Sequence, residues 1–412
     1  MRKIALLCIG DELLKGSTVN TNLAFIGSML LKHGITLEYS LEIPDDENAI
    51  RSALADALER ADIVLTSGGL GPTADDMTKE AVARHFHLPL EQNGPAVLSI
   101  RRFWKMRHPD TEPSGRVLNQ SLVPAGAVVI PNRNGTAPGI VLRPADGKMV
   151  ILLPGPPGEI CPMFEEDVMP LLLKEDLPRE QTVLLHICGI GESEVEERML
   201  PLLSTTHPLG AAYCAGHGAV KLFLRSGSGE VLADAIAYAK KEFGKAVLQT
   251  DNVAADVVAL LKKRGMTLVT AESCTGGLVA KMITDVAGAS DVYPGSVVSY
   301  ANEVKEQLLG VKHGTLVSYG AVSRETAREM AEGAAARFGS DCAIALTGIA
   351  GPGGGTPEKP VGLVYCGIFC GGRCEIFEFR LKRSREQIRE RAAAGALNRL
   401  RLMLLELEEN NG

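Results

Sequence analysis

The fold of the first part of the chain is decided by the stretch Asp62-Ile-Val-Leu-Thr66, which continues into the loop Ser67-Gly-Gly-Leu-Gly-Pro-Thr-Ala-Asp-Asp76. A short apolar run that ends in turn residues is typical of a buried strand. Before it, residues 50–61 repeat apolar side chains at helical spacing, and residues 2–9 and 35–43 have the composition of strands. This alternation predicts a parallel sheet with helices on both faces.

The order of elements divides the chain into three parts. Residues 1–170 and 251–412 each alternate strands and helices, whereas residues 171–250 follow the order strand, helix, strand, strand, helix. We therefore expect an α/β protein with two three-layer α/β domains, whose sheets are mainly parallel, joined by a small α+β module. The length of 412 residues fits two or three domains, since a domain usually has about 100–200 residues.

Composition excludes several classes of protein. The chain has 43 Lys and Arg against 50 Asp and Glu, and this balance does not supply the dense positive charge that direct nucleic-acid binding needs. No apolar run approaches the roughly 20 residues of a membrane-spanning helix, and Asp11 and Glu12 interrupt the apolar start of the chain. The nine cysteines never have Cys-x-x-Cys spacing. We expect a cytoplasmic protein that binds no membrane, with a homodimer as the default assembly.

The loop that follows Thr66 has the composition of a phosphate site. Its glycines let backbone N–H groups approach a phosphate closely, and they are Gly68, Gly69 and Gly71. Asp75 and Asp76 would repel that phosphate unless a divalent cation such as Mg²⁺ lay between them. The alternative is that residues 73–76 only cap the helix that follows.

These motifs resemble the molybdopterin-binding-like domain that opens proteins of the competence/damage-inducible CinA family. The resemblance covers about residues 1–170 and includes Gly10-Asp-Glu-Leu13, Asn119-Gln-Ser121 and Leu153-Pro-Gly-Pro-Pro-Gly-Glu159. It implies metal-dependent hydrolysis of the diphosphate of ADP-ribose. The residues that it places near metal and phosphate are Asp11, Asp75 and Asp76, and those that it places in the pocket are Asn119, Asn132, Gly155 and Glu159. Residues 171–250 resemble the KH-type module of the same family, but they lack a Gly-x-x-Gly loop flanked by basic residues, so they do not predict RNA binding.

A second candidate site begins in the stretch Thr270-Ala-Glu-Ser-Cys-Thr-Gly-Gly277. It runs from a predicted strand into a helix and presents hydroxyl groups and two glycines, Gly276 and Gly277, at the helix N-terminus, which suits an anion or an attacking nucleophile. Lys305 follows the next predicted strand, where the same sheet edge would present it to Ser273. A desolvated lysine that has lost its proton can activate a serine without histidine or metal.

Other interpretations of this stretch remain open. Cys274 is a possible nucleophile, but no histidine occurs between His217 and His313, which disfavours a Cys–His pair. Ser273 and Thr275 would also serve as helix caps.

Two further segments belong to the same prediction. The run Ala345-Leu-Thr-Gly-Ile-Ala-Gly351 follows an apolar strand and supplies backbone donors, including Gly348 and Gly351. Arg389 on the closing helix could clamp a phosphate with two hydrogen bonds, or it could be an ordinary charge on a solvated helix face.

These segments are similar to the C-terminal domain of the CinA family, the nicotinamide mononucleotide (NMN) deamidase family, over about residues 252–408. The resemblance implies hydrolysis of the carboxamide of NMN to nicotinate mononucleotide and ammonia, without a cofactor. It implies Ser273 as the nucleophile, with Thr275 as the alternative, and Lys305 as the base. It also implies that the substrate is aligned or bound by Tyr300, Asn302, Thr347 and Arg389. Two rival functions are a protein that only binds molybdopterin or a nucleotide, and an adaptor in competence or recombination.

Overall fold

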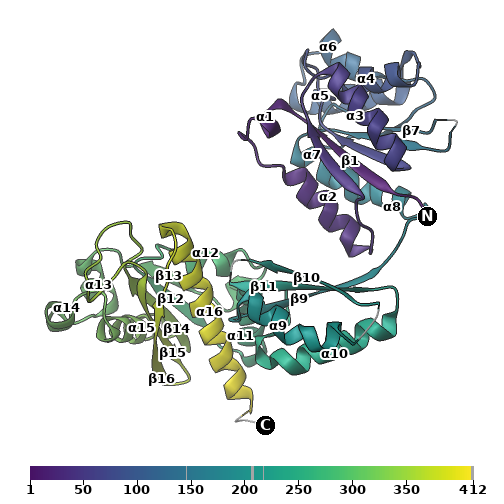
Figure 1. The fold of residues 1–412 in the computed structure, drawn as a ribbon. Coiled ribbons are helices and arrows are strands. Elements are labelled where there is room, and N and C mark those ends of the chain that lie inside the picture. Colours follow the sequence, from purple (N-terminus) through teal and green to yellow (C-terminus); the bar gives the residue numbers. More distant parts are fainter. Residues whose placement is uncertain (145, 206–207, 217, 410–412) are drawn as a thin grey trace. The chain divides into compact units, whose positions relative to one another are not determined.

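The computed structural model describes the whole chain except residues 145, 206–207, 217 and 410–412. The chain divides into two compact units, Met1–Thr182 and Val183–Gly412. Each unit combines helices with β-sheet (Figure 1). Among the described residues, no helix combines the length and the apolar character needed to span a membrane.

The first unit is built on a six-stranded sheet in the order β2-β1-β3-β8-β7-β6. The central pairs β1–β2, β1–β3 and β3–β8 are parallel, and β7 and β6 add an antiparallel edge. These strands are β1 (Ile4–Ile9), β2 (Tyr39–Ile43), β3 (Ile63–Ser67), β6 (Val128–Ile130), β7 (Gly139–Leu142) and β8 (Met149–Leu153). The predicted parallel sheet is confirmed in its centre. The antiparallel edge is an addition to the prediction, because strands of three and four residues leave little pattern in a sequence.

Successive residues of β1 explain why helices cover both faces of this sheet. Ile4 and Leu6 pack with α2 and α7, whereas Ala5 and Leu7 pack with α3 and α4. A parallel strand covered on both faces is apolar throughout, as the buried run of β1 is. The helices are α1 (Asp11–Leu14), α2 (Thr21–Lys32), α3 (Glu47–Arg60), α4 (Thr78–His85), α5 (Gly94–Arg107), α6 (Gly115–Leu118), α7 (Pro157–Met163) and α8 (Met169–Leu172), and the short strands β4 (Leu90–Gln92) and β5 (Leu122–Pro124) pair with each other.

The second unit contains two sheets. The smaller has the order β10-β11-β9 and packs against α9 and α10, and the larger has the order β13-β12-β14-β15-β16. In the larger sheet β12 is parallel to both of its neighbours, and β14, β15 and β16 are antiparallel in succession. Helices α11, α12 and α16 cover one face, and α13 and α15 cover the other. This unit therefore also has three layers, as the sequence predicts.

The elements of the second unit have the following bounds. The smaller sheet and its helices are β9 (Gln181–Cys188), α9 (Glu192–Leu203), β10 (Gly210–Ala215), β11 (Ala219–Ser226) and α10 (Gly229–Phe243). The larger sheet and its helices are α11 (Val253–Arg264), β12 (Leu268–Glu272), α12 (Leu278–Thr284), β13 (Gly295–Val298), α13 (Asn302–Leu309), α14 (His313–Tyr319), α15 (Arg324–Phe338), β14 (Cys342–Gly348), β15 (Leu363–Cys370), β16 (Arg373–Arg380) and α16 (Arg385–Glu409).

A buried ion pair joins the two parts of the second unit. Arg401 on α16 lies 3.4 Å from Asp256 on α11 and also donates to the backbone carbonyl of Lys245. The Asp256 carboxylate accepts hydrogen bonds from the backbone N–H groups of Gln249 and Thr250 at 3.0 and 2.8 Å. The boundary expected between residues 250 and 251 therefore lies inside one compact unit. The division of the chain into three domains stays a prediction.

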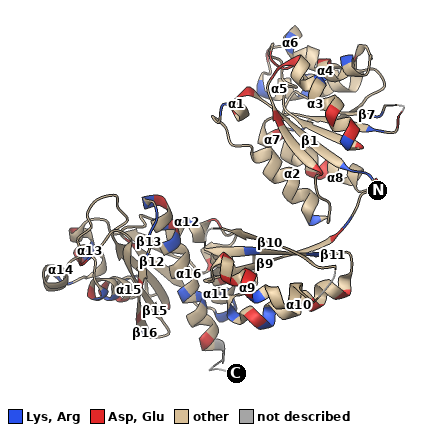
Figure 2. Ribbon diagram, viewed as in Figure 1, with Lys and Arg blue, Asp and Glu red and all other residues tan. Residues whose placement is uncertain are grey.

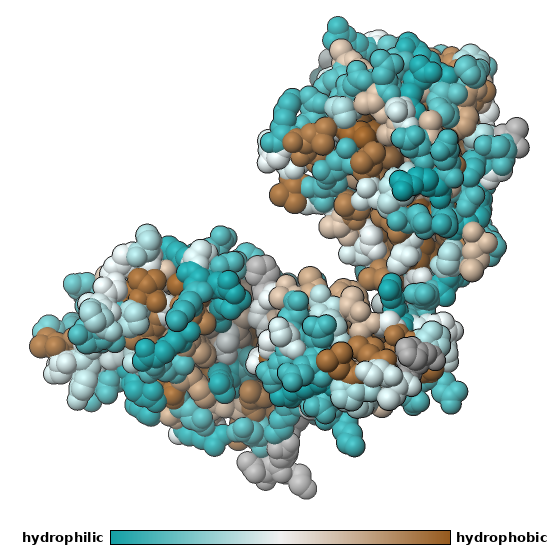
Figure 3. Space-filling model, viewed as in Figure 1, coloured by the Kyte–Doolittle hydropathy of each residue, from teal (hydrophilic) through white to brown (hydrophobic). Residues whose placement is uncertain are grey.

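The surface is mixed in both charge and polarity. Acidic and basic residues are interspersed on both units in the view of Figure 2. In the same view most of the surface is hydrophilic, with small apolar patches between the polar areas (Figure 3). Most large apolar side chains instead form the clusters between sheets and helices.

Candidate active sites

The register of the larger sheet brings Ser273 and Lys305 together. Glu272, the last residue of β12, pairs with Val298, the last residue of the parallel strand β13. The next residues, Ser273 and Ser299, therefore leave the sheet side by side, and the backbone N–H of Ser299 donates to the carbonyl of Glu272 at 2.8 Å. Helix α13 begins at Asn302, and its first turn carries Lys305 back towards the end of β12.

The amine of Lys305 is buried and has three oxygen neighbours. Its Nζ lies 3.2 Å from Ser273 Oγ and donates to the backbone carbonyls of Ser299 and Tyr300 at 2.8 and 3.3 Å. The side chain is 1% exposed, and burial lowers the pKa of Lys305 below its usual 10.5. A neutral amine has two N–H donors and one lone pair. With both donors on the carbonyls, the lone pair is left for the Ser273 hydroxyl.

Ser273 and Lys305 line a cavity of about 220 Å³, which is smaller than the usual 300–1,000 Å³ of a ligand pocket. The other predicted site residues in its lining are Tyr300, Asn302, Thr347 and Gly348. Thr347 on β14 is held in place because its hydroxyl donates to the carbonyl of Ala321 at 2.6 Å. A space of this size would enclose the reacting end of a nucleotide rather than a whole dinucleotide.

Neither alternative nucleophile has the environment of Ser273. The Thr275 hydroxyl is buried, lies outside the cavity lining and has no hydrogen-bond partner among the described residues. Cys274 does line the cavity, but burial raises the pKa of its thiol to about 11, which keeps it protonated near neutral pH. No histidine belongs to the part of the cavity wall that the structure describes. The geometry therefore favours Ser273.

Gly276 and Gly277 have a different role from the one expected. Their φ angles of 59° and 91° suit glycine, but both amides are already used: Gly276 N–H donates to the Ser273 carbonyl, and Gly277 N–H donates to the Glu272 carboxylate. Glu272 also accepts from the N–H groups of Val279 and Ala280. The carboxylate of Glu272 thus occupies the helix N-terminus at which the sequence analysis expected a bound anion. The two glycines shape the loop and do not line the cavity.

Arg389 likewise differs from the expected phosphate clamp. Its Nε and Nη2 donate to the backbone carbonyls of Cys274 and Thr275 at 3.2 and 2.6 Å, and it does not line the cavity. Arg385, one helical turn earlier on α16, does line it and donates to the Tyr300 hydroxyl at 3.3 Å. Arg385 also donates to the carbonyl of Gly351, the predicted backbone donor of the neighbouring loop. The sequence signal for Arg385 was its position four residues before Arg389, on the same helix face.

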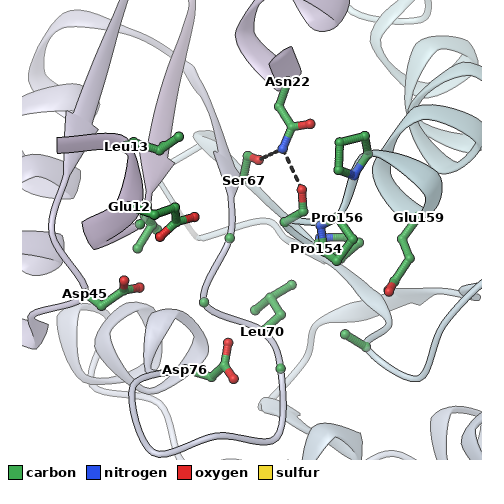
Figure 4. A pocket seen from close by; sticks show the side chains of 18 of the residues that line it. Glu12, Leu13, Asn22, Asp45, Ser67, Leu70, Asp76, Pro154, Pro156 and Glu159 are labelled. Carbon is green, nitrogen blue, oxygen red and sulfur yellow. Dashed lines mark hydrogen bonds between the residues drawn. The ribbon is translucent and has the colours of Figure 1, made fainter. Parts of the chain in front are cut away.

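The first unit contains a cavity of about 500 Å³ at the carboxyl ends of β1, β3 and β8 (Figure 4). Ligands of doubly wound sheets bind at this edge. The predicted site residues that line the cavity are Gly68, Gly69, Gly71, Asp75, Asp76, Gly155 and Glu159. The sequence analysis assigned no role to several polar residues of the lining, among them Glu12, Asn22, Asp45 and Gln120.

The glycines of the loop after β3 are required by close packing. A Cβ on Gly68 would lie 2.2 Å from the carbonyl oxygen of Ile9, and one on Gly69 would lie 2.1 Å from Thr78 Oγ1. Both residues have positive φ angles, 108° and 68°. A Cβ on Gly71 would likewise lie 2.4 Å from the Asp76 carboxylate. The glycines therefore allow the loop to pack closely against β1 and α4, so that the loop does not fill the cavity.

Asp76 shapes this loop instead of capping a helix. Its carboxylate accepts from the backbone N–H of Thr73 at 2.9 Å and from the Thr73 hydroxyl. Helix α4 begins two residues later, at Thr78, and its N-cap residue Met77 forms no side-chain cap. The capping alternative is therefore wrong for Asp76, which lies at the cavity in Figure 4.

The structure places Asp45, rather than Asp11, at the cavity. The Asp11 carboxylate pairs with Lys15 at 2.7 Å on the surface, and this hydrogen bond lowers the pKa of Asp11. Asp45 follows β2, and its carboxylate accepts from the backbone N–H of Asp11 at 2.9 Å. Burial raises the pKa of Asp45, and the nearby carboxylates of Glu12 and Asp75 raise it further. Asp11 thus positions Asp45 through its backbone.

Two predicted asparagines lie outside the lining. Asn132 donates to the Glu159 carboxylate at 2.6 Å and so holds it at the cavity wall, where burial raises the pKa of Glu159. Asn119 contributes only its backbone carbonyl, which accepts from Lys79, and its neighbour Gln120 lines the cavity instead. Figure 4 also shows Asn22, which donates to the Ser67 hydroxyl and to the Gly155 carbonyl at 2.8 and 2.7 Å.

The acidic residues of this cavity fit a metal ion only in part. Over the described residues, no group of three or more His, Cys, Asp or Glu side chains is arranged to hold a metal by itself. Mg²⁺ at nucleotide sites is usually bound by one or two carboxylates together with phosphate oxygens and water. Glu12, Asp45 and Asp75 line the cavity and would supply the carboxylates of such a set.

Comparison with known proteins covers both units. Residues 5–174 match the family described as probable molybdopterin binding domain, and residues 250–404 match the CinA C-terminal domain. A competence-damage inducible protein of Caldanaerobacter subterraneus subsp. tengcongensis is 42% identical over 97% of this chain and 98% of its own length. A CinA-like protein of Kosmotoga olearia is 40% identical over 98% of this chain and 100% of its own length. The crystal structure of the competence/damage inducible protein CihA from Agrobacterium tumefaciens covers 37% of this chain and 93% of its own, with 43% identity and a TM-score of 0.36. This chain belongs to the CinA family of competence/damage-inducible proteins.

Proposed function

We propose that the second unit hydrolyses the carboxamide of NMN to nicotinate mononucleotide and ammonia, with Ser273 as nucleophile and Lys305 as base. One observation carries this proposal: the buried amine of Lys305 lies 3.2 Å from Ser273 Oγ and has carbonyl acceptors for its other protons. A lysine held in this way can take up the serine proton without histidine or metal. The identity of the substrate comes from the family resemblance.

The proposed reaction has two steps. Ser273 Oγ attacks the carboxamide carbon while its proton passes to Lys305, and the resulting ammonium group returns that proton to the departing nitrogen, which leaves as ammonia. A water molecule then attacks the serine ester and gives a proton to Lys305. Lys305 returns that proton to Ser273 Oγ as the ester bond breaks, and nicotinate mononucleotide leaves as the carboxylate with its proton released to solvent. Thr347 on β14 and Tyr300, which follows β13, both line the cavity and would align the ring. Arg385 is the cavity residue with the charge to bind the phosphate.

Ammonia release from NMN tests this proposal. Ser273→Ala and Lys305→Gln should each reduce the rate at least about 100-fold, because a positioned general base contributes roughly 10²–10⁴-fold. Lys281→Gln is the matched control, since Lys281 lies on α12 with its amine paired to Asp285 on the surface. Release of ammonia by Lys305→Gln at the wild-type rate would remove the mechanism.

We also propose that the first unit hydrolyses the diphosphate of ADP-ribose with a divalent ion. The cavity of about 500 Å³ supports this proposal, because it combines a glycine loop with carboxylates at the sheet edge where nucleotides bind. The ion would screen the diphosphate from Asp75 and Asp45. Chelation should abolish the formation of AMP and ribose 5-phosphate, and added Mg²⁺ should restore it. Absence of hydrolysis with any divalent ion would leave the rival function of a molybdopterin- or nucleotide-binding domain, which mass spectrometry of a co-purifying ligand would identify.

The remaining expectations concern binding partners, oligomeric state and cellular location. We propose a cytoplasmic homodimer that acts on small nucleotides and does not bind nucleic acid directly. Sedimentation at micromolar concentration tests the dimer, and a filter-binding assay with RNA and DNA tests the exclusion of nucleic acid. A pull-down under reducing conditions tests the rival function of an adaptor in competence or recombination.

A further inference from the structure

A third cavity lies inside the second unit, away from both candidate active sites. Its volume is about 680 Å³, larger than either of the others, and it lies between the three-stranded sheet and α16. One wall is the loop between β9 and α9, around Gly189 and Gly191, and the opposite wall is the stretch of α16 from Arg391 to Leu402. No step of the proposed reactions uses this space.

Two glycines let the small sheet pack closely against α16 at this cavity. Gly189 has a φ angle of 80°, and a Cβ there would lie 3.0 Å from the side-chain nitrogen of Asn398. A Cβ on Gly218 would lie 2.4 Å from that of Ala394 on α16. Glycine at these two positions lets the backbone of the small sheet approach α16 on either side of the cavity.

Three arginines line this cavity, and Arg401 is paired with Asp256, whereas the other two have no matching acid among the described residues. Arg391 and Arg399 both line it, and neither forms an ion pair or hydrogen bond with any residue that the structure describes. Arg399 rests on an aromatic ring, with its Cζ 4.8 Å from the centroid of Phe377. The one carboxylate of the lining, that of Glu192, is held by the backbone N–H of Ala215 at 2.8 Å. Two guanidinium groups are thus available to an anion.

The start of α9 adds backbone donors on the facing wall. This helix of 12 residues begins at Glu192, and its N-cap residue Gly191 provides no side-chain cap. The first N–H groups of an uncapped helix carry partial positive charge and bind phosphate groups well. Guanidinium groups bind the same oxygens from their side with two parallel hydrogen bonds. The first turn of α9 also carries the carboxylates of Glu192 and Glu194, which are held by the backbone N–H of Ala215 and by Arg198. The backbone N–H groups of this wall are therefore the part of it that favours a phosphate.

We propose that this cavity binds a phosphate-bearing small molecule, with Arg391 and Arg399 on one wall and the Gly189–Gly191 loop on the other. The aliphatic and aromatic wall formed by Phe379 and Leu381 gives room for the organic part of such a ligand. The proposal does not depend on the reactions assigned to the two active sites.

Hydrogen–deuterium exchange of the full chain tests it at the site itself. AMP and inorganic pyrophosphate are the probes, and either should slow exchange in residues 188–195 and in the middle of α16. AMP also has the chemistry to bind at the cavity of the first unit, but protection there falls in different peptides. Protection confined to the first unit or to the Ser273 cavity, with both probes at millimolar concentration, would overturn the proposal.

A double substitution supplies the second test. Arg391→Gln with Arg399→Gln should weaken the binding of the probe that protects residues 188–195 by at least about tenfold, because the two guanidinium groups supply the charge-assisted hydrogen bonds to phosphate. Arg337→Gln is the control, because it removes an exposed charge of the same kind from α15, outside the cavity. Far-ultraviolet circular dichroism checks that the variant is folded. Equal affinity of the double variant and the control would also overturn the proposal.

Discussion

Arg389 on α16 holds the backbone of Thr275: its Nη2 donates a 2.6 Å hydrogen bond to the Thr275 carbonyl, and its Nε donates to the carbonyl of Cys274. The loop that carries Ser273 is therefore fixed from outside by a helix more than a hundred residues away in the chain. Arg385, one turn earlier, is the arginine that lines the cavity. Of two arginines on one helix face, Arg389 thus holds the loop backbone and Arg385 faces the cavity.

This division of tasks predicts different kinetics for the two arginines. Arg389→Ala should lower kcat for NMN about 10–100-fold with little change in KM, because a shift of the Ser273 loop by about 1 Å is enough for a loss of that size. Arg385→Ala should mainly raise KM, because it removes a charge from the lining of the cavity, where the proposed substrate would bind. Steady-state kinetics of ammonia release measures both. A rise in KM alone for Arg389→Ala would restore Arg389 as the phosphate clamp.

The pH dependence of the proposed amidase reaction should report on Lys305. Burial lowers the pKa of Lys305 below its usual 10.5, and only the neutral amine accepts the Ser273 proton. Below that pKa the amine is charged and the enzyme is inactive, so kcat/KM should rise with pH and level off below pH 10.5. Lys305→Arg keeps the charge but does not lose its proton in this range, and it should be inactive at every pH. If kcat/KM of Lys305→Arg rose with pH as in wild type, Lys305 would not be the base.

Strand ends made the Ser273 and Lys305 site predictable from sequence. Each residue follows a strand of the same parallel sheet, and the structure pairs the last residues of these strands in register. The sequence could not show in this way whether Arg385 or Arg389 lines the cavity, because this depends on how α16 packs against the β12–α12 loop. Glu272 was missed for another reason. Nothing in the sequence indicates that an acidic side chain in a strand will accept hydrogen bonds from the first N–H groups of the following helix.

The first unit shows the same limit. The glycine loop and its site at the sheet edge followed from composition, but the ligand set did not. Asp45 reaches the cavity because β2 lies parallel to β1, which brings the end of β2 beside Gly10 and Asp11. The order of strands is a property of the whole sheet, so the sequence pointed to Asp11, the carboxylate nearest in the motif.

This placement predicts unequal effects for two aspartates on ADP-ribose hydrolysis. Asp75→Asn should remove most activity and raise the Mg²⁺ concentration needed, because Asp75 lines the cavity. Asp11→Asn should keep activity within a few-fold of wild type, because its carboxylate pairs with Lys15 and only its backbone contacts Asp45. Product formation against Mg²⁺ concentration measures both. A loss in Asp11→Asn as large as that in Asp75→Asn would return Asp11 to the ligand set.

The pH dependence of the same reaction concerns Asp45. Burial and neighbouring carboxylates raise the pKa of Asp45 above its usual value, so it is protonated at higher pH than an ordinary aspartate when the solution is acidified. Protonation would remove the charge of a carboxylate that is proposed to bind the metal. As the pH is lowered, the apparent affinity of the wild type for Mg²⁺ should therefore decrease. The affinity of Asp45→Asn should be weaker throughout but should change less with pH. Calorimetric titration with Mg²⁺ between pH 4 and 7 measures this, and identical pH profiles would show that Asp45 is not involved.

Glu272 should be among the least replaceable residues of the second unit. It is fully buried, and its two carboxylate oxygens accept three backbone N–H groups at the start of α12, from Gly277, Val279 and Ala280. Glu272→Gln puts an amide N–H₂ opposite N–H donors and leaves at least one of them unsatisfied, which should cost about 2–4 kcal/mol of unfolding free energy. For a unit of this size the melting temperature should then fall by about 5–15 °C. Glu197→Gln, at an exposed position of α9, should change it by less than about 2 °C. Calorimetric melting of the two variants beside wild type provides the measurement, and equal melting temperatures would mean that the carboxylate does not hold the helix on which the Ser273 loop depends.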